Sequence, residues 1–163
     1  EKVNTHGGSI RIYIKKSKKV KTENSVSKIL KEEEKFGIKN FKTYQKFGEE
    51  VYKIRENVRF NIKKIKENKN TIIGYGAPAK ATTALNFFGI SNEIDFIVED
   101  NKLKHNKFIP GVKIAIKNKS QIKNKKNIII VLAWNFFDNI KKNNAKLSEK
   151  FINIKDLETN NWK

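Results

Sequence analysis

Residues 71–89 read TIIGYGAPAKATTALNFFG, and this stretch decides the fold class of the chain. The apolar run 71–73 is typical of a buried strand, and the glycines of 74–76 allow a tight turn. Residues 78–88 favour a helix, and Gly89 is placed to end it. A strand, a glycine turn and a helix in this order are typical of a Rossmann-like α/β domain.

The glycine turn matches the dinucleotide-binding fingerprint only in part. Its pattern is Gly-x-Gly-x-x-x-Lys, which lacks the third glycine and is not a Walker loop either. The turn is either a tight structural connection or a place where a nucleotide or phosphate meets the start of the helix. We favour the second interpretation because ligands of open α/β sheets bind at the carboxyl ends of strands. The candidate binding residues of this turn are Gly74, Tyr75, Gly76, Ala77, Pro78, Ala79 and Lys80.

The chain beyond this helix continues to alternate strands with helices. Strands are predicted at 93–100, within 107–116, at 127–134 and at 150–154, and a helix is predicted at 135–142. The continuous apolar segment 127–134 is typical of a strand buried on both faces of a parallel sheet. We therefore predict an α/β fold with a Rossmann-like, doubly wound parallel sheet.

Polar and aromatic residues follow several of these predicted strands. Glu99 and Asp100 stand where an acidic residue grips a ribose hydroxyl in dinucleotide-binding folds, although solvated carboxylates are an equal alternative. Trp134 either stacks on a base or fills the core, and the core is the simpler interpretation. Because strand ends of a parallel sheet converge at one edge, we predict one substrate-binding site there. Its further candidates are Glu99, Asp100, Asn101, Lys107, Pro110, Gly111, Trp134 and Asn135.

The first part of the chain has a different texture. Residues 9–14 alternate apolar and polar side chains and predict a strand, which a lysine-rich linker follows. A helix capped by Ser25 or Ser27 is predicted to end at Gly37. A long amphipathic helix is predicted over 41–65. Its apolar stripe must pack against another surface, for which the core is the simpler interpretation and a protein interface the alternative. An exposed part of that stripe leaves a homodimer open.

The chain of 163 residues carries a formal net charge of +19 but contains only three arginines. Specific nucleic-acid surfaces rely on arginine for bidentate contacts, so we expect no specific nucleic-acid partner. The charge still attracts anions, and residues 101–137 hold nine lysines and no acidic residue. No apolar run is long enough for a membrane span, and the opening residues lack a signal-peptide pattern. We expect a cytoplasmic protein without a membrane partner.

The sequence offers little for catalysis. Cysteine is absent, which excludes disulfides, thiol nucleophiles and cysteine-ligated metals, and the two histidines cannot form a metal site alone. His6 precedes two glycines and is a candidate acid–base group, although a lone histidine before a strand is more often structural. No triad is visible, so the catalytic residues are unknown. Methionine is also absent and the chain opens on Glu1, which favours a piece of a longer protein.

Five blocks carry a family resemblance, and they occur in order over nearly the whole chain. Together they resemble the C-terminal domain of bacterial S-adenosylmethionine-dependent C-methyltransferases that act on nucleotide-linked deoxysugars. The blocks are HGGSIRIYI (6–14), GYGAPAKATTALNFFGI (74–90), IDFIVEDN (94–101), KFIPGVKI (107–114) and VLAWNF (131–136).

The resemblance implies an enzyme of three parts. A zinc-binding N-terminal module and a middle domain that binds S-adenosylmethionine would both lie outside this chain, together with the family's tyrosine–glutamate–histidine catalytic segment. Residues 1–22 would be the terminal strand and linker of the methyl-donor domain, residues 23–67 connecting helices, and residues 68–163 the Rossmann-like C-terminal domain. This domain would close over a nucleotide-diphosphate sugar in deoxysugar biosynthesis, and the fragment alone would be inactive.

A second interpretation treats the chain as a stand-alone Rossmann-type module that binds NAD or a similar nucleotide. It predicts a preference for NAD over thymidine or uridine diphosphate. A third treats it as a basic nucleic-acid-binding protein, with binding that falls steeply as salt rises.

Overall fold

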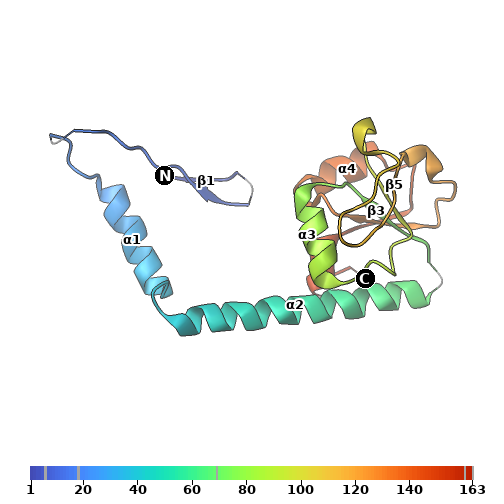
Figure 1. The fold of residues 1–163 in the computed structure, drawn as a ribbon, viewed down its shortest axis with the longest axis horizontal. Coiled ribbons are helices and arrows are strands. Elements are labelled where there is room, and N and C mark those ends of the chain that lie inside the picture. The colour runs from blue at the N-terminus through green and yellow to red at the C-terminus, as the bar shows by residue number, and fades with distance from the viewer. Residues whose placement is uncertain (6, 18, 69, 160, 163) are drawn as a thin grey trace. The chain divides into compact units, whose positions relative to one another are not determined.

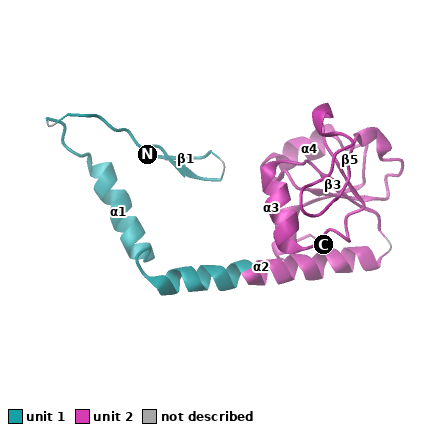
Figure 2. Ribbon diagram, in the orientation of Figure 1, with its two compact units in different colours: residues 1–51 teal, residues 52–163 magenta. Residues whose placement is uncertain are grey.

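The structure is a computed structural model that describes residues 1–5, 7–17, 19–68, 70–159 and 161–162. The chain divides into two compact units, residues 1–51 and residues 52–163 (Figure 2), and the boundary falls within helix α2 (Phe41–Glu67). The long helix predicted from periodicity is therefore present.

The first unit consists of a small hairpin, helix α1 and the first half of α2. The hairpin pairs β1 (Lys2–Val3) with β2 (Ser9–Ile10) in antiparallel fashion. Helix α1 (Asn24–Phe36) ends as predicted at Gly37, whose φ of 84° is left-handed and whose N–H donates to the carbonyls of Glu33 and Glu34. The predicted caps Ser25 and Ser27 are wrong, because the helix begins at Asn24 without a capping side chain.

The strand predicted over 9–14 is wrong beyond Ile10. Within the described part of this unit only β1 pairs with it, and the ladder ends after Ser9–Ile10. Ile12 and Ile14 are 73% and 92% exposed. An alternating pattern indicates a strand, but a strand forms only where a neighbouring backbone supplies hydrogen bonds.

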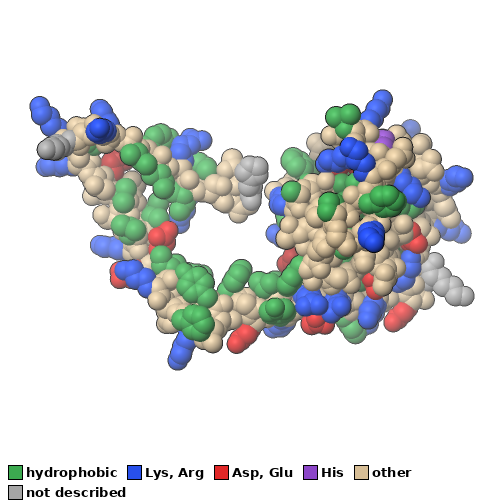
Figure 3. Space-filling view, viewed as in Figure 1, with side chains coloured by type: hydrophobic (Ala, Val, Ile, Leu, Met, Phe, Trp, Pro, Cys, Tyr) green, Lys and Arg blue, Asp and Glu red, His purple; other side chains and the backbone are tan. Residues whose placement is uncertain are grey.

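No described residue of 1–51 is buried. Large apolar side chains instead lie on the surface of α1 and the first half of α2 (Figure 3), including Leu30, Phe36, Phe41 and Phe47. The first unit therefore has no hydrophobic core of its own.

The second unit contains a parallel sheet of five strands (Figure 1). They are β3 (Ile72–Tyr75), β4 (Phe96–Val98), β5 (Ile116–Lys117), β6 (Ile128–Val131) and β7 (Lys150–Asn153). Their spatial order is β5-β4-β3-β6-β7, so the first strand of the unit lies in the middle. The chain reverses its direction across the sheet between β3 and β6, which is the topological switch point of a Rossmann-like fold. The fold class predicted from the sequence is confirmed.

Helices cover both faces of this sheet. Ile72 and Ile97 face the second half of α2 and helix α3 (Ala79–Phe88), where Val58, Ile62 and Leu85 are fully buried. Side chains of the opposite face pack against helix α4 (Phe137–Asn143). The doubly wound arrangement follows, because successive side chains of a strand point to opposite faces. The core is thus the partner of the second half of the α2 stripe.

Several element boundaries differ from those predicted. The strand expected within 107–116 lies at Ile116–Lys117, preceded by an antiparallel bridge between Phe108 and Ala115. The helix expected over 135–142 is a 3₁₀ turn, Trp134–Phe136, followed by α4. Further 3₁₀ helices at Lys102–Lys104, Lys119–Gln121 and Ile154–Glu158 were not expected. Among the described residues, no helix has the length and apolar character needed to cross a membrane.

Candidate functional site

The carboxyl ends of β3, β4 and β6 surround a hollow of about 390 Å³, which we call the strand-end hollow. It lies at the switch point, where ligands of open α/β sheets bind. Its lining residues are Tyr75, Gly76, Pro78, Glu99, Asp100, Lys104, Ala133, Phe136, Asn139 and Ile140.

Close packing of the backbone against neighbouring side chains explains why both Gly74 and Gly76 of the β3–α3 turn are glycines. A Cβ atom on Gly74 would lie 2.8 Å from Cγ1 of Ile97, so any side chain there would collide with the core. Gly76 has a φ of 89°, and a Cβ atom there would lie 2.9 Å from the Cβ of Ala133. Gly76 also donates its N–H to the carbonyl of Val98 at 2.8 Å. The turn is held tightly against the two neighbouring strands.

The side chain of Glu99, just after β4, binds the backbone of this turn. Its Oε2 accepts the N–H of Ala77 at 2.8 Å, and its Oε1 accepts the N–H of Asn101 at 3.1 Å. The Nζ of Lys104 donates to the carbonyl of Ala77 at 2.9 Å and lies 3.5 Å from Oε2 of Glu99. Glu99 and Lys104 together hold both backbone polar groups of Ala77, an arrangement we call the turn clamp.

The clamp keeps Glu99 ionised. Burial alone would raise the pKa of this carboxyl, whose side chain is 14% exposed. The N–H donors of Ala77 and Asn101, together with the Lys104 ammonium, outweigh burial and hold its pKa below the ordinary value of 4.5. Glu99 lines the hollow, but both of its carboxylate oxygens already accept backbone N–H groups of Ala77 and Asn101.

Asp100 is anchored from the opposite side. Its Oδ2 accepts the hydroxyl of Tyr75 at 2.9 Å, and its Oδ1 accepts the Nζ of Lys119 at 3.0 Å. Burial works against its charge, yet the bonds from Lys119 and Tyr75 prevail and lower its pKa. Burial and the neighbouring carboxylate raise the pKa of the Tyr75 phenol well above its usual value, so Tyr75 stays neutral.

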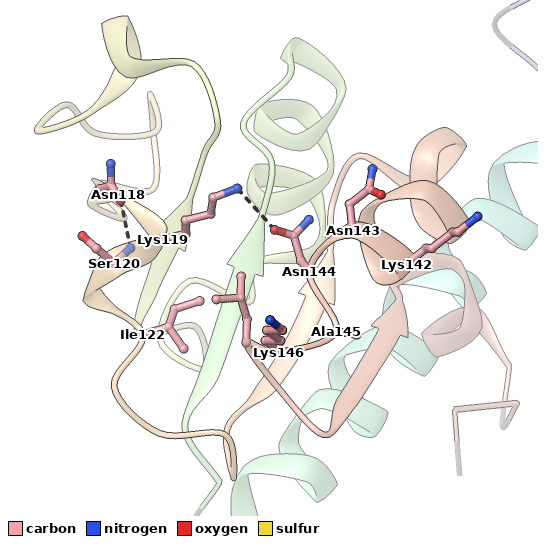
Figure 4. A pocket seen from close by; sticks show the side chains of 10 residues that line it. Asn118, Lys119, Ser120, Ile122, Lys142, Asn143, Asn144, Ala145 and Lys146 are labelled. Atoms are coloured by element: carbon pink, nitrogen blue, oxygen red, sulfur yellow. Dashed lines mark hydrogen bonds between the residues drawn. The ribbon is translucent and has the colours of Figure 1, made fainter.

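A second hollow of about 620 Å³ lies beside this network, and we call it the lysine hollow (Figure 4). Lys119 reaches across from the segment after β5 to the Oδ1 of Asn144, at 3.3 Å. Ile122 and Leu147 add apolar lining. Three lysines line this hollow. Lys119 belongs to the lysine-rich segment 101–137, Lys142 lies at the end of α4, and Lys146 follows that helix. Lys119 links the two hollows because it also pairs with Asp100.

Trp134 takes the core position predicted for it, and stacking on a base stays a prediction. It is half-buried and packs against the main core. The Nζ of Lys80 lies 4.6 Å from the centre of its ring, a cation–π distance. Lys80 itself is exposed in the first turn of α3.

Other residues predicted from the sequence lie elsewhere. The carbonyl of Pro110 accepts Nδ2 of Asn86 near the far end of α3, and Gly111 packs against the same side chain. Asn101 uses its side chain to cap the 3₁₀ helix Lys102–Lys104. Lys107, Ala79 and Asn135 are exposed and line neither hollow. His6 lies outside the described residues.

The sequence reasoning missed half of the residues that line the strand-end hollow. Lys104 follows Glu99 by five positions, and nothing in that spacing signals that it reaches back to Ala77. Phe136 and Asn139 fall within the helix predicted over 135–142, and although Phe136 closes the block 131–136, no pattern marks either residue as lining a site. The residues found only in the structure are Lys104, Ala133, Phe136, Asn139 and Ile140.

Comparison with known proteins places the chain in a family. Residues 4–153 match the family described as C-methyltransferase C-terminal domain. The chain is 29% identical to the C-methyltransferase NovU of Streptomyces niveus over 147 aligned residues. The aligned region covers 88% of this chain and 35% of that protein. The chain therefore spans about a third of the length of the curated relative it matches. Because the family match covers most of both units, the chain belongs to the family of C-methyltransferase C-terminal domains.

Proposed function

We propose that this chain is the substrate-binding, C-terminal part of a sugar C-methyltransferase. The whole protein would transfer a methyl group from S-adenosylmethionine to a carbon of a nucleotide-linked keto-deoxysugar. The observation that carries the proposal is an open hollow at the switch point of a chain that belongs to this family. The relative that it resembles is itself named a C-methyltransferase.

The first unit supports a role within a larger protein. Its described residues include no buried side chain, while Phe36, Phe41 and Phe47 are each about 70% exposed. Apolar area of this extent is costly to leave in water and is typical of surfaces that another part covers. The relative extends well beyond the aligned region, which leaves room for such a part in the whole protein.

The chain's own residues do not fit the methyl donor. S-adenosylmethionine carries an adenosine, and Rossmann-like folds hold a nucleotide ribose with a carboxylate at the end of the second strand. Here the first carboxylate at that position, Glu99, already accepts bonds from Ala77, Asn101 and Lys104. The turn also lacks the third glycine of the fingerprint. The donor would bind elsewhere in the whole protein.

The same clamp disfavours the stand-alone NAD module. A dinucleotide pyrophosphate binds to free N–H groups of the glycine turn, but the N–H of Ala77 is held by Glu99. An incoming phosphate would have to displace a carboxylate that is 14% exposed. A nucleotide sugar whose diphosphate stays outside the hollow needs no such displacement.

Methyl transfer by the intact protein tests the proposal directly. The protein encoded by the whole gene is incubated with isotope-labelled S-adenosylmethionine and a panel of nucleotide-linked keto-deoxysugars. Label that appears on a sugar carbon supports the proposal. Transfer to none of these sugars, with clear transfer to a compound that lacks a nucleotide, contradicts it.

A binding measurement tests the contribution of this chain. Lys80→Ala removes an exposed ammonium from the start of α3 without touching the core. An exposed charge contact of about 1 kcal/mol predicts a loss of nucleotide-sugar affinity of about fivefold, and a smaller loss at high salt. The matched control is Lys63→Ala, because Lys63 is an exposed helical lysine of α2. Equal affinity of both variants in titration calorimetry would remove Lys80 from the site.

A further inference from the structure

The lining of the strand-end hollow combines two carboxylates with an exposed aromatic ring, that of Phe136. We propose that the hollow takes the nucleoside end of the nucleotide sugar. Phe136 stacks on the base, Asp100 accepts a hydroxyl of the pentose, and the diphosphate lies outside the hollow. This inference rests on the proposed function, because it assumes that the ligand is a nucleotide sugar.

The charges of the lining argue against a diphosphate inside the hollow. Two carboxylates, Glu99 and Asp100, line it against one ammonium, Lys104. That ammonium is already used by the carbonyl of Ala77 and by Glu99. A diphosphate placed there would meet like charges at short range, which costs binding energy. An uncharged, hydroxyl-bearing group does not meet this repulsion.

Of the two adjacent carboxylates, Asp100 is the one that can accept a further hydrogen bond. An ionised carboxylate offers about four acceptor positions, and Asp100 uses two of them, for Tyr75 and Lys119. Its side chain is 58% exposed, whereas that of Glu99 is 14% exposed. Tyr75 and Lys119 also fix the orientation of the carboxylate. Asp100 is thus held in place with lone pairs left for a ligand.

Phe136 supplies the stacking surface. It lies on the 3₁₀ turn after β6, lines the hollow and is 66% exposed. Aromatic side chains of this kind stack on bases of any sequence, because every base has a π-face. Asn139, on the first turns of α4, lines the same hollow and offers an amide that both donates and accepts. The hollow thus presents a stacking face and an amide suited to a base, and a carboxylate suited to a pentose.

The size of the hollow fits one end of the ligand. Its volume of about 390 Å³ is near the lower limit of ligand pockets, about 300–1,000 Å³. Pro78 and Ala133 line it, and they neighbour Lys80 and Trp134 in the chain. The exposed Lys80 ammonium therefore stands near the rim, where a diphosphate leaving the hollow would find a cation.

The test compares three ligands on the intact protein: a nucleotide sugar, its free nucleoside and inorganic pyrophosphate. Phe136→Ala is expected to weaken the nucleotide sugar and the nucleoside by about tenfold each, within the range for a base that loses its stacking partner. Pyrophosphate binding stays unchanged. The matched control is Phe108→Ala, because Phe108 is 62% exposed and does not line the hollow. Asp100→Asn is expected to weaken the nucleoside as well, and Lys80→Ala only the two phosphate-bearing ligands.

The outcomes separate the inference from the proposed function. Wild-type binding of the nucleotide sugar with equal affinity in Phe136→Ala and Phe108→Ala overturns the inference and leaves the proposed function standing. A loss of pyrophosphate binding in Phe136→Ala also overturns it, because the diphosphate would then lie inside. Failure of the wild-type protein to bind any nucleotide sugar refutes both. Thermal unfolding of each variant confirms that the fold is intact before binding is compared.

Discussion

Replacing Glu99 by alanine tests whether the turn clamp holds the Rossmann-like unit together. The substitution removes the acceptor of the Ala77 N–H, the acceptor of the Asn101 N–H and the counter-ion of Lys104. Because both backbone polar groups of Ala77 depend on this pair of side chains, we expect the β3–α3 turn to lose its main restraint.

The size of the effect follows from the three contacts. A partly buried hydrogen bond to a charged acceptor, as at Ala77, contributes about 1.5–3 kcal/mol. The more exposed bond from Asn101 contributes about 0.5–1 kcal/mol. The pair with Lys104, at 3.5 Å and with Lys104 39% exposed, contributes less than about 1 kcal/mol after screening by solvent. We expect Glu99→Ala to lower the free energy of unfolding by about 3 kcal/mol.

The assay is urea denaturation of the protein, monitored by tryptophan fluorescence. Trp134 and Trp162 both lie in residues 52–163, so the signal reports the unfolding of the second unit. Glu99→Gln keeps the shape and one acceptor oxygen, so about half of the loss is expected. Glu149→Gln is the control, because Glu149 has an exposed side chain. A loss below about 1 kcal/mol in Glu99→Ala, or equal losses in both Glu99 variants, refutes the clamp.

The pH dependence of the stability provides an independent check on the role of Glu99. The pKa of Glu99 is lowered in the folded state, so its contribution is fully present above the ordinary value of 4.5. That contribution is lost as the pH falls below 4.5 and through the lower folded pKa. The difference in stability between wild type and Glu99→Gln should therefore be largest near neutral pH and shrink in acid. A difference that grows as the pH falls would contradict the assignment.

Four further substitutions, at three positions, probe other parts of the fold. Gly76→Ala forces a left-handed φ of 89° on an alanine whose Cβ would lie 2.9 Å from that of Ala133, so we expect about 1–3 kcal/mol less stability by urea denaturation. Gly48→Ala, on α2 with no atom within 4 Å of its added Cβ, should instead increase helicity by circular dichroism, with a gain of about 1 kcal/mol; equal effects of the two would refute the argument. Asn61 is 2% exposed and donates to the carbonyls of Leu157 and Thr159, so Asn61→Ala should cost about 2 kcal/mol. Asn61→Asp should cost more, since a buried carboxylate would face two carbonyls without a donor; a smaller loss in Asn61→Asp than in Asn61→Ala would count against this account.

The order of elements in the second unit could be read from local patterns. The strand at Ile72–Tyr75, the helix ending at Gly89 and the apolar strand β6 all lie where periodicity and punctuation predicted them. Such patterns succeed because each element largely satisfies its own backbone or is buried on both faces. The strand over 9–14 failed for the opposite reason, because its extent depends on a partner strand.

The candidate site shows the same division. The carboxyl ends of β3, β4 and β6 were predicted to converge, and the strand-end hollow lies there. The two adjacent acids looked alike in the sequence, yet Glu99 turns toward the backbone of Ala77 and Asp100 toward Tyr75 and Lys119. Pro110 was grouped with the site, but it contacts Asn86 on α3 instead.

Local patterns in the sequence were enough to predict the α/β class, the Rossmann-like doubly wound parallel sheet and the family of this protein. These properties follow from short-range signals: apolar runs, glycine turns and ordered blocks along the chain. Which side chains line the hollow and which hold the backbone is set by the tertiary structure. Those roles depend on distances between residues far apart in the chain, such as Lys104 and Ala77 or Phe136 and Asp100. No local pattern encodes such distances, because they are set by how strands and helices pack in three dimensions.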